Sequence, residues 1–141
     1  MTFTNPSPEK ICALLRSIHT IAVVGLSPNR VRPSYQVAHA LQARGYRIVP
    51  VRPLIQEVLG ETAFPDLESL PGKVDIVQVF RASEHVPAIV DSCIKLGIQR
   101  LWLQDGVVDQ QAALRAQQAG ITVIMNRCMW RDYAHLCEAA S

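Results

Sequence analysis

The sequence has few of the features that would place a chain in or across a membrane. None of its apolar runs approaches the roughly 18 consecutive residues of a membrane-spanning helix. Its first residues, MTFTNPSPEKICALL, contain no cationic stretch that leads into an apolar one and no small-residue cleavage site, so nothing marks them for export. We therefore expect a cytoplasmic protein without a membrane partner.

Cysteine is scarce and shows no metal-ligand spacing. The cysteines form no C-x-x-C motif or similar pattern, and they stand at Cys12, Cys93, Cys128 and Cys137. In a cytoplasmic chain, cysteines scattered in this way indicate reduced thiols. We therefore expect neither a disulfide framework nor a metal site.

Charge of either sign is also low. The formal net charge of +2 at pH 7 is too small to indicate a nucleic-acid partner. Lysine is rare, because only three of the 14 basic residues are lysines. The others are arginines, whose planar guanidinium group is suited to bidentate contact with phosphate. The positions of these arginines therefore matter more than the net charge.

The residues that are present predict one α/β domain over residues 1–141, because the length and the 49% hydrophobic composition suit a single core. Apolar runs typical of buried parallel strands lie at 21–24, 47–51, 75–80, 100–103 and 121–125. Helical patterns that end at a glycine lie between them at Ser34–Arg44, Ser83–Leu96 and Asp109–Ala119. This alternation predicts a doubly wound parallel sheet with right-handed crossovers.

The remaining segments add shorter elements. Ser7 and Pro8 are typical of a helix start, and apolar residues at helical spacing follow them. The other expected elements are a short helix at Leu54–Leu59, a short edge strand at Glu61–Phe64, a helical turn at Leu67–Leu70 and a last helix at Trp130–Ala139. The predicted sheet thus has five long strands plus a short edge strand.

In sheets of this kind ligands bind outside the carboxyl ends of the strands, where the strand order reverses. The arginines expected in those loops are Arg30, Arg32, Arg52, Arg81 and Arg127. Together with the N-terminus of the helix after the first strand, they favour a phosphate-bearing ligand. We expect Ser34 to cap that helix and also to donate a hydrogen bond to the ligand.

The loop after the first strand lacks the glycine fingerprint of dinucleotide-binding domains. Gly25 stands alone in GLSPNRVRPS, where G-x-G-x-x-G would be expected. The second strand ends in Val51, Arg52 and Pro53, without the acid that binds the ribose of NAD. An arginine there fits a ribose that carries its own phosphate, as in NADP or coenzyme A (CoA).

These residues resemble a known family, the small stand-alone CoA-binding proteins, which are similar to the N-terminal CoA-binding domain of the succinyl-CoA synthetase alpha subunit. The resemblance rests on IAVVGLSPNRVRPSYQVAHALQARGYRIVPVRP, EVLGETAFPDLESLP, VDIVQVFRASEHVPAIV and LWLQDGV, and it covers about residues 11–136. It implies a Rossmann-like fold with CoA lying across the strand ends.

The resemblance also implies roles for individual residues. The implied positions are Gly25, Ser27, Arg32 and Ser34 in the phosphate-binding loop, Val51, Arg52 and Pro53 beside the adenosine, Phe80, Arg81 and Ala82 on the opposite wall, and Gln104 with Gly106 near the pantetheine. Typical members have an apolar residue at the position of Asp105 and an acid at that of Asn126. A carboxylate at Asp105 would oppose a polyanionic ligand unless it pairs with an arginine such as Arg127.

Few side chains near the expected site are suited to catalysis. Cys128 follows the last strand beside Arg127, which would favour the thiolate, although a free cysteine is most often a small buried side chain. His85 is the only histidine expected near the ligand. No histidine has a serine, cysteine or carboxylate partner at the spacing of a catalytic triad.

We therefore expect a non-catalytic protein that binds CoA or an acyl-CoA and holds no metal. The alternative interpretation is an NADP-type redox or sensor domain, against which the missing glycines and the missing acid argue. A third interpretation is a thiol enzyme that works through Cys128, for which no base is placed by the spacing. The sequence leaves open whether a protein partner takes part.

Overall fold

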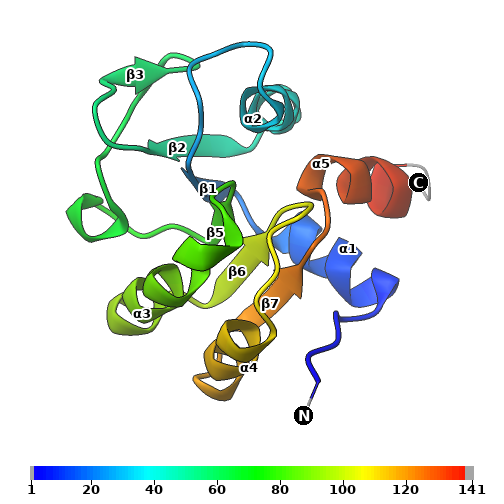
Figure 1. The fold of residues 1–141 in the computed structure, drawn as a ribbon. Helices are drawn as coiled ribbons and strands as arrows, with labels where there is room; N and C mark the ends of the chain where they lie inside the picture. The colour runs from blue at the N-terminus through cyan, green and yellow to red at the C-terminus, as the bar shows by residue number, and fades with distance from the viewer. Residues whose placement is uncertain (1, 139–141) are drawn as a thin grey trace.

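The computed structural model describes residues 2–138 and contains a five-stranded parallel sheet (Figure 1). The strands lie in the order β2-β1-β5-β6-β7, and every neighbouring pair is parallel. Their bounds are Thr20–Val24 (β1), Arg47–Val51 (β2), Ile76–Val79 (β5), Arg100–Leu103 (β6) and Thr122–Met125 (β7). Each strand falls in an apolar run chosen from the sequence, so the predicted α/β fold is confirmed.

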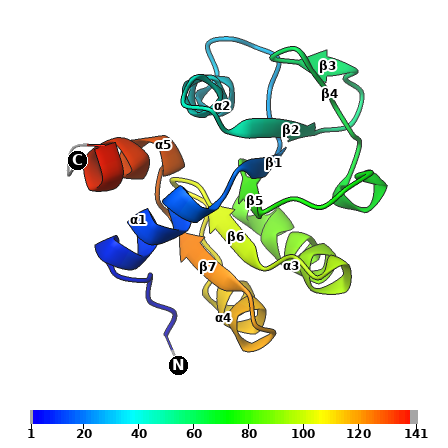
Figure 2. The same cartoon turned by 180° about the vertical axis from the view of Figure 1, so that it is seen from behind.

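Helices cover both faces of this sheet (Figures 1 and 2). On one face α3 (Val86–Leu96) and α4 (Gln110–Gln118) pack against the strand side chains that point to that face. On the other face lie α1 (Pro8–Ser17), α2 (Pro33–Ala43) and α5 (Met129–Asp132), the last continued by the π-helical segment η3 (Tyr133–Glu138). The two buried clusters are separated by the sheet, which is the doubly wound, Rossmann-like arrangement.

Local signals in the sequence set several helix ends. Ser7 caps α1 by accepting a hydrogen bond from the backbone N–H of Lys10, at 3.3 Å. Asp109 caps α4 in the same way, accepting from Ala112 at 2.9 Å. The three-residue turn η2 (Ser83–His85) leads directly into α3, so the predicted helix Ser83–Leu96 is present as two joined pieces.

The segment between β2 and β5 differs from the expectation. The predicted helix at Leu54–Leu59 is wrong, because β3 (Glu57–Val58) and β4 (Glu61–Thr62) form an antiparallel hairpin there. Both residues of the hairpin turn, Leu59 and Gly60, have positive φ angles of 56° and 75°. That conformation belongs to a tight hairpin turn, which an apolar-periodicity argument does not detect.

The predicted edge strand at Glu61–Phe64 reaches the main sheet through its last residue. Phe64 forms a parallel bridge to Val51, and its backbone bonds both Arg52 and Pro50, at 2.8 and 3.0 Å. This bridge occupies the outer position beside β2, where the Rossmann order 3-2-1-4-5-6 has its third strand. The helical turn expected next is present as η1 (Leu67–Ser69).

The prediction of four reduced thiols is wrong for one pair. Cys12 on α1 and Cys137 on η3 form a disulfide, with their Cα atoms 5.4 Å apart. The two residues are 125 positions apart, so their pairing depends on the packing of α1 against η3 and no local spacing encodes it. Cys93 and Cys128 are free and buried. In the described part of the chain no helix is long and apolar enough to cross a membrane.

Candidate functional site

Two adjoining cavities lie at the carboxyl ends of the central strands. The larger has a volume of about 620 Å³ and the smaller about 320 Å³, and both are lined by Gly25, Arg52 and Phe80. We refer to the two together as the groove. It lies at the ends of β1 and β5, between which the strand order reverses, and this is where open α/β sheets bind their ligands.

The structure brings together all but one of the residues chosen from the sequence. The larger cavity is lined by Gly25, Val51, Arg52, Pro53, Phe80, Arg81 and Ala82 among others. The smaller is lined by Gly25, Ser27, Arg32, Ser34, Arg52, Phe80 and Gln104 among others. The exception is Gly106, which lines neither cavity; its N–H donates to the side-chain oxygen of Asn126 at 2.7 Å.

Gly25 lets the loop after β1 approach the loop after β5 at backbone distance. Its φ angle is 87°, and a Cβ atom added there would lie 3.1 Å from the carbonyl oxygen of Phe80 and 3.1 Å from Cδ of Arg81. A side chain would therefore both strain the backbone and push on the groove wall.

We predict that Gly25→Ala destabilises the fold by about 1–3 kcal/mol, the usual cost of a strained backbone conformation, and weakens ligand binding as well. Gly45→Ala is the matched control, because Gly45 has a φ of 98° but an added Cβ there has nothing within 4 Å. Thermal unfolding of both variants measures the difference. Equal losses in the two variants would show that the contact with Phe80 and Arg81 is unimportant.

The loop from β1 to α2 is held by its own side chains. The hydroxyl oxygen of Ser34 accepts a hydrogen bond from the N–H of Ser27 at 3.0 Å, and that of Ser27 accepts from the N–H of Asn29 at 3.1 Å. The side-chain oxygen of Asn29 in turn accepts from the N–H of Val31 at 3.1 Å. These hydrogen bonds fix the conformation of the loop, and the hydroxyl hydrogen of Ser34, which is donated to no described residue, is available to a ligand.

Ser34 is not the cap of α2, so that prediction is wrong. The helix begins at Pro33, because the fixed φ of proline suits the first helical position, and the cap is Arg32. The cap makes no side-chain hydrogen bond, and the first turn carries no acidic residue. The N-terminus of α2 is therefore electrostatically open to an anion at the smaller cavity.

The arginines at the strand ends are not equivalent. Arg52 lines both cavities, and its side chain makes no hydrogen bond or ion pair with residues 2–138. The side chain of Arg81 forms one hydrogen bond with residues 2–138, between its Nη2 and Nε2 of His85 at 3.1 Å. Arg127 is committed elsewhere, since it makes two hydrogen bonds to the buried carboxylate of Asp132 at 2.6 and 2.9 Å. The hydrogen bond with Asp132 raises the pKa of Arg127.

Asp105 lines the smaller cavity, but its carboxylate is paired with an arginine. Its two carboxylate oxygens each accept a hydrogen bond from Arg131 of α5, at 2.9 Å. These bonds hold the pKa of Asp105 below its usual value. The partner is Arg131 rather than Arg127, which the sequence had suggested, because Asp132 already holds Arg127.

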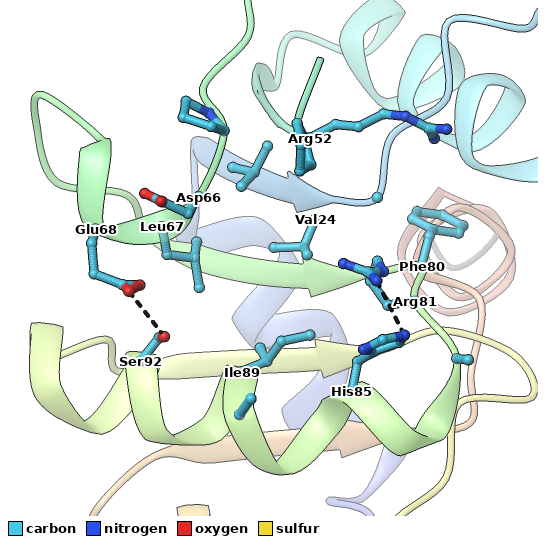
Figure 3. A pocket seen from close by; sticks show the side chains of 16 residues that line it. Val24, Arg52, Asp66, Leu67, Glu68, Phe80, Arg81, His85, Ile89 and Ser92 are labelled. Carbon is cyan, nitrogen blue, oxygen red and sulfur yellow. Dashed lines mark hydrogen bonds between the residues drawn. The ribbon is translucent and has the colours of Figure 1, made fainter. Parts of the chain in front are cut away.

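One wall of the larger cavity was missed from the sequence, except for His85, which was expected near the ligand. It consists of α3 together with the segment at η1, through Pro65, Asp66, Leu67, Glu68, His85, Ala88, Ile89 and Ser92 (Figure 3). The last four follow the helical spacing i, i+3, i+4, i+7, a signal that marks one face of α3 and could have found them. Because a guanidinium only donates, Nε2 of His85 is the acceptor in its hydrogen bond with Arg81.

The described part of the groove lining contains no cysteine, although it contains Asp66, Glu68 and His85. Cys128 is buried at the N-cap of α5 and lines neither cavity. Among residues 2–138 no cluster of His, Cys, Asp and Glu side chains could hold a metal ion. The groove offers arginines, backbone donors and apolar surface.

A Rossmann-like sheet with an open helix N-terminus beside its switch point and an unpaired arginine after β2 has the architecture in which open α/β domains bind nucleotides. The match to a family is more specific. The chain belongs to the CoA binding domain family, which it matches over residues 19–134. This confirms the family predicted from the sequence.

Individual relatives agree with this assignment. YneT of Bacillus subtilis (strain 168), an uncharacterized protein, is 40% identical over 125 residues, which are 89% of this chain and 93% of YneT. An ADP-forming acetate–CoA ligase II of Archaeoglobus fulgidus is 26% identical over 82 residues, which are 57% of this chain and 12% of the ligase. Among solved structures, a hypothetical protein from Pyrococcus horikoshii OT3 superposes with a TM-score of 0.89 at 32% identity, covering 96% of this chain and 99% of that one.

Proposed function

We propose that this protein binds CoA or an acyl-CoA in the groove and does not catalyse a reaction on it. The observation that carries the proposal is Arg52, a guanidinium between the two cavities that has no partner within the described chain. An unpaired arginine at the carboxyl end of β2 favours a ribose phosphate, which CoA carries and NAD lacks.

The remaining groups suit the other parts of CoA. The N-terminus of α2 and the hydroxyl of Ser34 favour the pyrophosphate at the smaller cavity. Val51, Pro53 and Ile89 supply apolar surface for the adenosine at the larger one. No carboxylate with an uncompensated charge faces the pyrophosphate, because Asp105 is neutralised by Arg131.

Gln104 is placed to contact the pantetheine. Its side-chain oxygen accepts from the N–H of Met129 at 2.9 Å and from Nε2 of Gln78 at 3.0 Å. The oxygen is thus committed, and the amide NH₂, which no described residue accepts from, is left as a donor at the smaller cavity. A donor in that position suits a carbonyl oxygen of the pantetheine arm or of a thioester.

The absence of catalysis is part of the proposal. General-base catalysis needs a base within hydrogen-bond reach of the reacting group. His85 is held by Arg81, and Cys128 lies outside the groove lining. A thiol enzyme would need Cys128 to enter the groove, whereas this side chain is buried at the N-cap of α5.

NADP is the alternative ligand, because Arg52 would also suit a phosphate on the 2′ position of a ribose. Isothermal titration against CoA, acetyl-CoA and NADP decides between them. We expect heat from CoA and acetyl-CoA and none from NADP, together with no release of free thiol from acetyl-CoA. Binding of NADP without binding of CoA would overturn the assignment of CoA as the ligand. Steady release of free thiol would overturn the non-catalytic role.

A further inference from the structure

The larger cavity has opposite charges at its two ends. Figure 3 shows Asp66 and Glu68 at one end and Arg81 and His85 at the other, with Leu67 and Ile89 between them. An adenosine phosphate has a matching polarity, since its phosphate is an anion and its base carries an exocyclic amine that donates hydrogen bonds. The proposed function places the adenosine in this cavity but assigns no role to its acidic end.

The length of the cavity can be measured along α3. His85 precedes the first residue of this helix and Ser92 lies on its second turn, so the two are separated by about 10 Å at roughly 1.5 Å per residue. This is comparable with the distance from the phosphate of a nucleotide to the far edge of its base. A CoA molecule whose 3′-phosphate lies at the basic end of the cavity, which Arg52 also lines, would therefore bring the far edge of its base to Ser92 and Glu68.

The two carboxylates at that end of the cavity, Asp66 and Glu68, accept hydrogen bonds from different partners. One oxygen of Asp66 accepts the N–H of Ser69 at 2.9 Å, and Asp66 thereby caps the turn η1. Glu68 instead accepts from the hydroxyl of Ser92, with Oε2 to Oγ at 3.3 Å. Ser92 thus holds one carboxylate oxygen of Glu68 across the end of the cavity, and the other oxygen accepts no hydrogen bond from residues 2–138.

We propose that Glu68, held by Ser92, determines base specificity by accepting a hydrogen bond from the 6-amino group of adenine. The inference rests on the proposed function, because it takes the ligand to be CoA. A carboxylate only accepts, so it favours an amine at this position and opposes the carbonyl oxygen of a 6-oxopurine. Leu67 and Ile89 contact the faces of the ring, which both bases share.

The test compares CoA with deamino-CoA, in which hypoxanthine replaces adenine, by isothermal titration. The native protein is expected to bind CoA at least about tenfold more tightly, because deamino-CoA leaves a charged acceptor facing an oxygen. Glu68→Gln is expected to bind both ligands within about threefold of each other, since an amide both donates and accepts. Glu68→Gln should therefore bind deamino-CoA more tightly than the native protein does. Such a gain in affinity would not occur if Glu68 had only a structural role.

Glu9→Gln is the matched control, because it removes the same charge from the exposed first turn of α1, outside the groove. It should keep the preference of the native protein. Equal binding of CoA and deamino-CoA by the native protein would overturn the role of Glu68 while leaving CoA binding intact. A preference that persists unchanged in Glu68→Gln would also overturn it, and no binding of either ligand would overturn the proposed function itself.

Discussion

Reduction of the disulfide between Cys12 and Cys137 is expected to lower the free energy of unfolding by up to about 5 kcal/mol, because the bond closes a loop of nearly the whole chain and restricts the unfolded state. For a domain of this length that corresponds to a fall in Tm of up to roughly 17 °C. Thermal unfolding with and without dithiothreitol measures the effect. The secondary structure at low temperature should be unchanged.

The double variant Cys12→Ala with Cys137→Ala is the control for the reductant. It should unfold at the lower temperature whether or not dithiothreitol is present. Alkylation of the unfolded, unreduced protein supplies a direct check, since only Cys93 and Cys128 should react. Labelling of all the cysteines would show that the bond is absent and would remove the basis of this expectation.

Arg52→Ala is expected to weaken CoA binding by about 10- to 100-fold, which is the loss of a charge-assisted hydrogen bond or pair of bonds to a phosphate. Its side chain has no partner in the described chain, so the fold should keep its stability and the effect should appear in affinity alone. Dephospho-CoA lacks the 3′-phosphate, and its affinity should change little in the variant.

Two further variants test whether the effect depends on the shape and the position of the Arg52 side chain. Arg52→Lys keeps the charge but loses the planar fork, and it should fall between the native protein and the alanine variant. Arg47→Ala removes an arginine from the opposite end of the same strand and should leave CoA affinity unchanged. If Arg52→Ala still separates CoA from dephospho-CoA as strongly as the native protein, another residue contacts that phosphate, and Arg81 is the next to test.

Strands and most helices were predictable because their signals are local. The apolar runs are continuous where a strand is buried on both faces, and Asp109 and Ser7 announce helix starts within three residues. The strand ends could then be assembled into a site by topology alone, which is why Arg52, Gly25 and Arg81 were chosen from loops far apart in the sequence.

Most of the errors have a different cause. The hairpin turn at Leu59 and the pairing of Asp105 with Arg131 depend on geometry that residue type does not specify. The helix start at Pro33 is instead a local signal that was missed, because proline suits the first helical position. The disulfide depends on contact between the first and last helical segments. The wall formed by α3 and η1 was missed, apart from His85, because the site residues were chosen from the segments at the strand ends.

The disulfide also gives the chain the connectivity of a closed ring. A backbone cut at an exposed loop, such as the one at the fully exposed Leu54, would leave both fragments in one covalent molecule. One fragment would carry Gly25 and Arg52 and the other Phe80 and Arg81, so the two halves of the groove would remain tethered. Their encounter would be intramolecular at any protein concentration, and the nicked protein could reassemble its groove without a bimolecular step.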